Sequence, residues 1–272
     1  MLFPLSILFG ALVGFALGLT GGGGSLLAVP LLVYGLAIAP RDAFGVSLAA
    51  VGATALVGVV PRIRAGQVEV GTGVLFAVAG MVGAPLGTWT AGLIPETMLL
   101  TLFSVLMLVV AWRMWSKSQM TTDDAVPSVC DTESNGPTCQ RTSDGKLRLT
   151  SRCALLLTLV GLATGFLSGM FGVGGGFVIV PALVLFSGMP IRKAVATSLL
   201  VIVLVSISGV TSHFAAGRGI SLEVTGLFVL GGVIGMALGG LASKRLSAQL
   251  LQKVFATGIV AVAIFIVSKT FA

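Results

Sequence analysis

Two glycine-rich stretches decide the fold of this chain: GLTGGGGSLLAVPLL at residues 18–32 and GMFGVGGGFVIVPALV at residues 169–184. Each lies inside apolar sequence, and in each a proline follows the glycines, Pro30 in the first and Pro181 in the second. Consecutive glycines weaken a helix because their backbone is freer than that of any other residue. Both stretches therefore predict a break between two helical segments.

The composition around these stretches is that of an integral membrane protein. Hydrophobic residues make up 56% of the 272 residues, charged residues only 9%, and the mean hydropathy is +1.10. Several apolar runs are long enough to cross a hydrocarbon core of about 30 Å, which takes roughly 20 helical residues. We therefore expect an all-α, multi-pass protein of a bacterial inner (plasma) membrane, with lipid as a partner. The first run lacks the basic n-region of a cleavable signal peptide, so we expect it to remain in the mature protein.

The apolar runs form two groups separated by a polar stretch. The expected helical segments are 2–19, 26–39, 44–61, 71–93 and 97–115 in the first group, and 153–170, 177–190, 195–216, 222–243 and 249–268 in the second. The segments that follow the glycines, 26–39 and 177–190, are too short for independent spans. We predict an N-terminal transmembrane repeat at 1–115, a polar cytoplasmic linker at 116–152 and a C-terminal transmembrane repeat at 153–272.

The two groups are related by an internal duplication. A shift of 151 residues brings many identical residues of mixed type into one register without a gap, and one inserted residue extends the match to a further glycine series. The aligned pairs include Gly21 with Gly172, Pro30 with Pro181, Arg41 with Arg192, Ser47 with Ser198, and then Gly80, Gly83 and Gly87 with Gly232, Gly235 and Gly239. We conclude that the chain consists of two homologous halves.

The distribution of basic residues predicts how the halves are oriented, because loops on the cytoplasmic side carry most lysines and arginines. If each glycine-broken element is a helical hairpin followed by three transmembrane helices, thirteen of the 16 basic residues lie on one side. If each element crosses the membrane once instead, the division is ten and six. The hairpin arrangement is favoured, and its three crossings per half predict inverted repeats with both termini outside. Arg41, Arg218 and Lys269 are then the basic residues on the outer side.

The glycine clusters are also the expected substrate site. In lipid, a helix break is tolerated only where its backbone polar groups are buried in protein or line a polar cavity. A half-helix that starts after the glycines directs free N–H groups and its positive dipole end at such a cavity, which suits a small anion. Two breaks from inverted halves would meet near the membrane midplane. Tight helix packing remains the alternative role for any single glycine.

The candidate substrate-binding residues belong to the two clusters and to the helices that follow them. They are Thr20, Gly21, Gly22, Gly23, Gly24, Ser25, Ser47, Gly172, Gly174, Gly175, Gly176, Thr197 and Ser198. The hydroxyls among them could equally bond the backbone of their own helices. Arg41 and Arg192 could line a vestibule or anchor their helices at lipid headgroups. His213, the only histidine, matches Arg62 in the repeat and could carry a proton or simply pack.

Both glycine motifs, followed by Arg41-Asp42-Ala43 with Ser47 and by Arg192-Lys193-Ala194 with Thr197-Ser198, resemble the sulfite exporter TauE/SafE family, also called the TSUP family. The resemblance covers almost the whole chain except the linker. It implies a membrane transporter of small sulfur-containing anions such as sulfite, sulfoacetate or other organosulfonates. Members differ in substrate, so the individual anion does not carry over. The long linker with Cys130 and Cys139 departs from the family pattern, and no role follows for it.

Several other classes of function fit the sequence less well. The apolar runs contain no convergent acidic residues, no His–Cys ligand spacing and no nucleophile–base set. We therefore expect that the protein is not an enzyme and has no cofactor and no metal site. The net charge of +7 comes from basic residues at the ends of apolar runs, so no nucleic-acid partner is expected. The alternatives that remain open are an anion channel and a proton-coupled carrier of a different small anion. The oligomeric state is also open, with a homodimer as one option.

Overall fold

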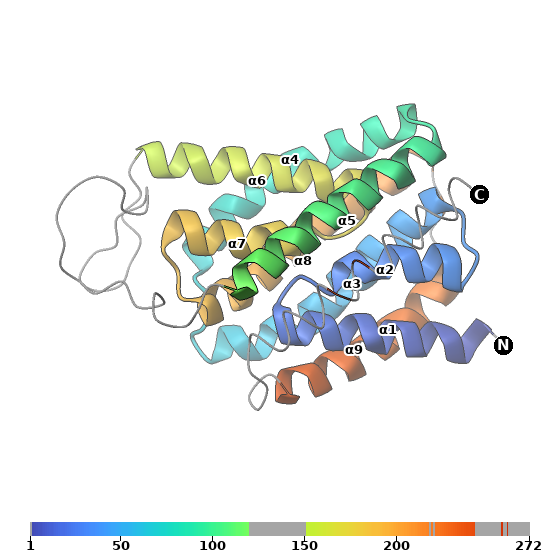
Figure 1. Cartoon of the computed structure of the whole chain (residues 1–272), viewed down its shortest axis with the longest axis horizontal. Coiled ribbons are helices and arrows are strands. Elements are labelled where there is room, and N and C mark those ends of the chain that lie inside the picture. The colour runs from blue at the N-terminus through green and yellow to red at the C-terminus, as the bar shows by residue number, and fades with distance from the viewer. Residues whose placement is uncertain are drawn as a thin grey trace.

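The computed structural model of the chain is a bundle of helices (Figure 1). It describes residues 2–119, 151–217, 219 and 221–242, together with 257 and 260. Within these residues all regular secondary structure is helical, which confirms the all-α prediction. The elements are α1 (Leu2–Thr20), α2 (Ser25–Pro30), the π-helix η1 (Leu31–Gly35), α3 (Pro40–Arg64), α4 (Val70–Leu93), α5 (Glu96–Gln119), α6 (Ser151–Phe171), α7 (Gly176–Ser187), α8 (Ile191–Ala215) and α9 (Leu222–Ala242).

These helices follow the expected segments, with a few differences at their ends. The segment expected at 26–39 is divided into α2 and η1, because Pro30 has no N–H with which to continue the α-helical hydrogen bonds. Helix α3 starts earlier than expected, at Pro40, since the fixed φ of proline suits the first turn of a helix. The expected linker at 116–152 is helical at both ends, and residues 120–150 lie outside the described residues. The segment expected at 249–268 also lies largely outside them.

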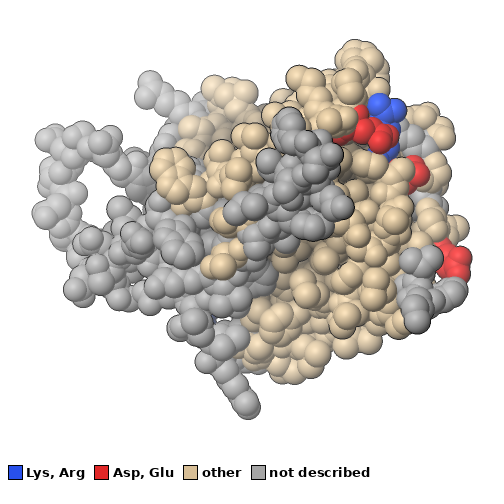
Figure 2. Space-filling model, turned by 45° about the vertical axis from the view of Figure 1, so that its right-hand side comes forward, with Lys and Arg blue, Asp and Glu red and all other residues tan. Residues whose placement is uncertain are grey.

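Five of the described helices are long and apolar enough to cross a membrane: α3, α4, α6 from Cys153 onward, α8 and α9. Their outward-facing side chains include large apolar groups, such as Trp89 at 67% exposure and Leu230 at 61%. Figure 2 shows a face on which the visible charged residues lie toward one end and the rest of the described surface is uncharged. Such a surface suits lipid as its solvent.

The two halves of the chain pack against each other through glycines. Helix α1 lies along α9, and α6 lies along α4 (Figure 1). A Cβ added at Gly14 would overlap the carbonyl of Gly232, and one added at Gly165 would overlap the carbonyl of Gly80. These two contacts are equivalent in the repeat. Because small residues let helix backbones approach closely, each half supplies one helix to a tight interface with the other half.

Helices α3 and α8 form the centre of the bundle. In each, 67% of the most apolar stretch is buried inside the protein, against 33% in α9. The two central helices contact each other, and each also packs against a helix of the opposite half, α3 against α9 and α8 against α4. From Ala43 in α3 and Ala194 in α8 onward, these helices therefore run through the interior, where the glycine clusters lie.

Candidate functional site

Both glycine clusters interrupt their helices and are completely buried. Helix α1 ends at Thr20 and α2 begins at Ser25, and in the second half α6 ends at Phe171 and α7 begins at Gly176. Every residue from 21 to 30 and from 171 to 177 is buried. The backbone of both breaks is thus enclosed by protein, as the low polarity of a membrane requires.

The two breaks touch each other, backbone against backbone. A Cβ added at Gly22 would lie 2.6 Å from the Cα of Gly176, and one added at Gly176 would lie 2.5 Å from the Cα of Gly22. Real Cβ atoms do not come so close to a neighbouring backbone. The contact is therefore available only to glycine at both positions.

Each break also rests on the central helix of the opposite half. Gly21, with φ of +74°, packs against Val195 at the start of α8, and Gly172, with φ of +67°, packs against Phe44 at the start of α3. Val195 and Phe44 are equivalent in the repeat. Because an L-residue with a side chain rarely adopts such a positive φ, glycine is needed here for its backbone as well as for its size.

The hydroxyls of the first break are bonded within it. Thr20 Oγ1 donates to the carbonyl of Ala16 at 2.8 Å and accepts from the amide of Gly23 at 2.9 Å. Ser25 Oγ donates to the carbonyl of Gly22 at 2.7 Å. These bonds give Thr20 and Ser25, both expected to bind substrate, a clear role in holding the turn.

The second break has a different backbone conformation from the first. Gly174 and Gly175 both have φ of +68°, whereas Gly21 is the only residue of the first cluster with a positive φ, and Gly24 has φ of −63°. The amides of Val178 and Ile179 both bond the carbonyl of Gly175, at 3.0 and 3.1 Å. Two clusters that are equivalent in sequence therefore present different surfaces.

Ser47 and Ser198 occupy equivalent positions but differ in their hydrogen bonds. Ser198 Oγ donates to the carbonyl of Gly21 at 2.8 Å and to that of Val195 at 2.9 Å. Ser47 Oγ is buried and has no hydrogen-bond partner within the described residues. Ser198 thus bonds the first break, whereas Ser47 lies on α3 between Phe44 and Val51, which pack against Gly172 and Gly174 of the second break.

Ser168 is a further buried hydroxyl at the second break, and the sequence analysis did not single it out. Its Oγ also lacks a hydrogen-bond partner among the residues that the structure describes. The Cβ of Ser168 lies 3.5 Å from the position that a Cβ added at Gly175 would occupy. The sequence spacing could have identified Ser168, because it comes four residues before Gly172 and therefore lies on the same face of the helix.

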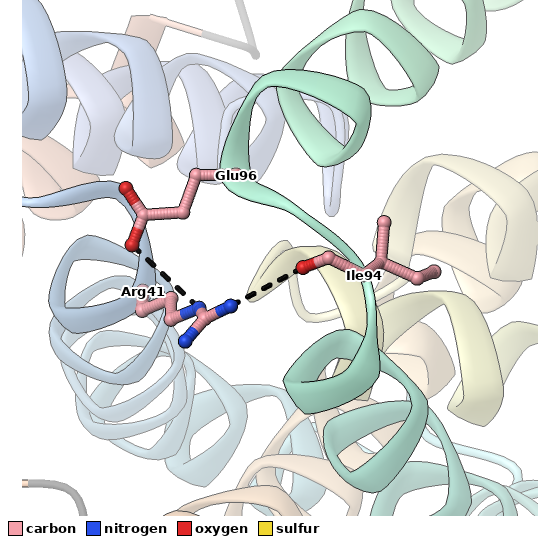
Figure 3. A network of polar contacts seen from close by, with 3 residues as sticks. All are labelled: Arg41, Ile94 and Glu96. Carbon is pink, nitrogen blue, oxygen red and sulfur yellow. Dashed lines mark hydrogen bonds and ion pairs between the residues drawn. The ribbon is translucent and has the colours of Figure 1, made fainter.

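The remaining candidate residues, Thr197 and the two arginines, have their contacts at the ends of helices or on the surface. Thr197 Oγ1 accepts from the amide of Glu69 at 3.0 Å, just before α4, so its hydroxyl caps that helix. Arg41 forms an ion pair with Glu96, Nε to Oε1 3.6 Å, and donates to the carbonyl of Ile94 at 3.2 Å, as Figure 3 shows.

Arg192 lies in the first turn of α8 and is exposed, so it lies on the outer surface of the bundle. Arg62, near the end of α3, was considered only as the counterpart of His213, and it donates to the carbonyl of Gly18 at 3.2 Å. It thereby satisfies a carbonyl in the last turn of α1, where no intrahelical donor is available.

Comparison with known proteins relates the sequence of this chain to a family of membrane proteins. The model of the family described as sulfite exporter TauE/SafE matches residues 6–266. A probable membrane transporter protein of Xylella fastidiosa is 36% identical over 269 residues, which cover 97% of this chain and 94% of the relative. The probable membrane transporter protein YunE of Bacillus subtilis is 26% identical over 261 residues, covering 93% and 91%. No solved structure matches the chain.

The contact between the breaks generates a prediction. Gly22→Ala and Gly176→Ala each place a Cβ against the opposite backbone, so we expect each to lower the thermal unfolding temperature of the detergent-purified protein clearly, by the equivalent of about 2 kcal/mol or more. Gly71→Ala is the matched control, because a Cβ at Gly71 meets nothing within 4 Å. Alanine there should leave stability unchanged or raise it by up to about 1 kcal/mol. Unfolding temperatures that are equal for all three variants would contradict the close contact.

Proposed function

This chain belongs to the sulfite exporter TauE/SafE family and is a membrane transporter, and on that premise we propose that it exports a small sulfur-containing anion of the sulfite or organosulfonate class. The observation that carries the proposal is the contact of Gly22 with Gly176, which brings both breaks together inside the protein. Backbone amides at helix breaks can bind an oxyanion without a basic side chain. The proposed substrate site is this pair of breaks, near the midplane of the membrane.

We further propose that the halves are inverted repeats, each a glycine-broken hairpin with three transmembrane helices. In Figure 1, α1 begins at the right, beside the label N, and its counterpart α6 begins at the left, so the two run in opposite directions. The equivalent contacts of Gly14 with Gly232 and of Gly165 with Gly80 fit a two-fold relation between the halves. In such repeats the substrate site lies at the interface of the halves, where the breaks are.

The membrane potential offers enough energy for export. All nine Asp and Glu residues lie near the ends of apolar runs or in the polar stretch between the halves, so no carboxylate is placed to bind a driving ion inside the membrane. A potential that is negative inside drives an anion outward by about 2.3 kcal/mol per charge per 100 mV, which supports roughly a fiftyfold gradient of a monovalent anion. We propose uniport down this potential.

This mechanism predicts how the reconstituted protein responds to voltage. We expect sulfite efflux from proteoliposomes to follow an imposed potassium-diffusion potential, to saturate with sulfite concentration, and to persist without a proton or sodium gradient. Efflux that stops when only the proton gradient is collapsed, with the potential clamped, would contradict uniport and support proton coupling. Efflux that does not saturate would support a channel.

The proposal also includes the orientation of the protein in the membrane. The distribution of basic residues favours a cytoplasmic linker and external termini. Cys153, at the start of α6, is disulfide-bonded, and disulfides persist mainly outside the reducing cytosol, which favours the opposite orientation. The charge distribution sums over residues in several loops, and we propose the orientation that it favours.

Labelling can decide the orientation. In a background where Cys130, Cys139 and Cys153 are replaced by serine, we expect Phe271→Cys to react with a membrane-impermeant maleimide in spheroplasts. Asp131→Cys should react only after the membrane is permeabilised. The reverse pattern would overturn the proposed orientation while leaving the transport proposal intact.

A further inference from the structure

We infer that the two glycine breaks have different roles, and that the second one holds the anion. In this assignment the amides of residues 173–177 and the hydroxyls of Ser47 and Ser168 bind the oxyanion, and the first break forms the wall against which this site is built. The inference rests on the proposed function and makes it more specific, because it assigns the substrate to one half of a duplicated structure. It also adds Ser168 to the binding residues.

The first break has already used most of its hydrogen-bond donors. The amides of Ser25, Leu26 and Leu27 donate to the carbonyls three residues earlier, at 3.1–3.3 Å. The amide of Gly21 donates to the carbonyl of Leu17 at 2.8 Å, and that of Gly23 donates to Thr20 Oγ1. An anion at this break would have to displace bonds that hold the turn together.

The second break keeps its donors open. The backbone bonds around it come from Gly172, Val178 and Ile179, and none comes from residues 173–177 in the described structure. Gly176 and Phe177 start α7, a helix of 12 residues, so their amides have no acceptor within the helix. A left-handed residue next to a right-handed one turns the neighbouring amides toward one side, which forms a concave anion-binding nest. Gly175, with φ of +68° and ψ of −2°, followed by Gly176 at the start of α7, provides that conformation.

Two buried hydroxyls point to a ligand at the same place. Phe44 packs against Gly172 and Val51 packs against Gly174, and Ser47 lies between them on the same face of α3. Ser168 approaches Gly175 from α6. Ser47 is 0% exposed and Ser168 is 1% exposed, and neither Oγ has a partner among the described residues. Buried polar groups are nearly always hydrogen-bonded, so a pair of unpaired hydroxyls beside an open nest indicates an acceptor that binds between them.

The chemistry of these donors defines the ligand class. The site offers amides and hydroxyls, which can all donate. Arg62 Nη2 donates to the carbonyl of Gly18 in α1, and Arg41 forms an ion pair with Glu96, so both of these contacts lie away from the second break. Such a set fits a compact oxyanion with several acceptor oxygens, such as sulfite or the head group of a sulfonate.

Binding measurements on the purified full-length protein test the role of the hydroxyls. We expect Ser47→Ala and Ser168→Ala each to weaken sulfite binding about tenfold in calorimetric titration, which is the loss of one hydrogen bond to a charged group. Ser104→Ala is the matched control, because Ser104 is equally buried but its Oγ donates to Leu100 within α5. It should bind sulfite within about twofold of the wild type. Wild-type affinity in both Ser47→Ala and Ser168→Ala would overturn the inference.

Locating the anion tests the inference without any substitution. Crystals of the wild-type protein soaked in selenite, the selenium analogue of sulfite, should show an anomalous peak beside Gly174 and Gly175. A peak at the first break only, or no peak at the second, would overturn the inference. A peak at the second break in a protein that moves no sulfite in proteoliposomes would keep the inference and refute the proposed function. The two failures are therefore distinguishable.

Discussion

The structure depends on the backbone contact between Gly22 and Gly176. Helix breaks expose amides and carbonyls that hydrocarbon cannot solvate, so two breaks within a membrane protein are best buried together. The contact excludes any side chain, which makes glycine necessary at both positions and determines how closely α2 and α7 approach. The second turns of α3 and α8 then close the arrangement, because Phe44 and Val195 each pack against the break of the opposite half. The surrounding helices enclose this crossing.

The glycine-rich interfaces outside the centre, between α1 and α9 and between α6 and α4, also hold the two breaks in place. Helix α1 is packed on α9 and α6 on α4, so the helix that leads into each break is held by the opposite half of the chain. Hydrogen bonds cross between the halves as well, from Ser198 to Gly21 and from the amide of Glu69 to Thr197. Neither half therefore encloses its own break. This interlocking explains why the small residues match in both halves, since each interface has a counterpart with the same steric requirement.

The sequence predicted the helices and the position of the breaks because these depend on local composition and on the repeat. Pro30 and the glycine runs are strong local signals, and the 151-residue register ties the halves together. The different conformations of the breaks could not be predicted in the same way, because the side chains that face Gly174, those of Val51 and Ile202, belong to helices distant in the sequence. The capping of α4 by Thr197 joins residues 128 positions apart, which no local pattern reveals.

The difference between the halves also bears on how a transporter can bind an anion and still release it. Arginine in the site would hold an oxyanion by bidentate, charge-assisted bonds, which favour binding more than release. In this protein the guanidinium groups of Arg41 and Arg62 are engaged with Glu96 and with backbone carbonyls at helix ends. Amide and hydroxyl donors replace the lost hydration of the anion more weakly than arginine would. Their positions are fixed by the fold, so the geometry of binding is fixed as well. Under the proposed function, selectivity comes from the arrangement of these donors, and release is fast because amides and hydroxyls, rather than a guanidinium, hold the anion. A duplicated fold can supply this with one open break, because the other break is then free to stabilise the structure.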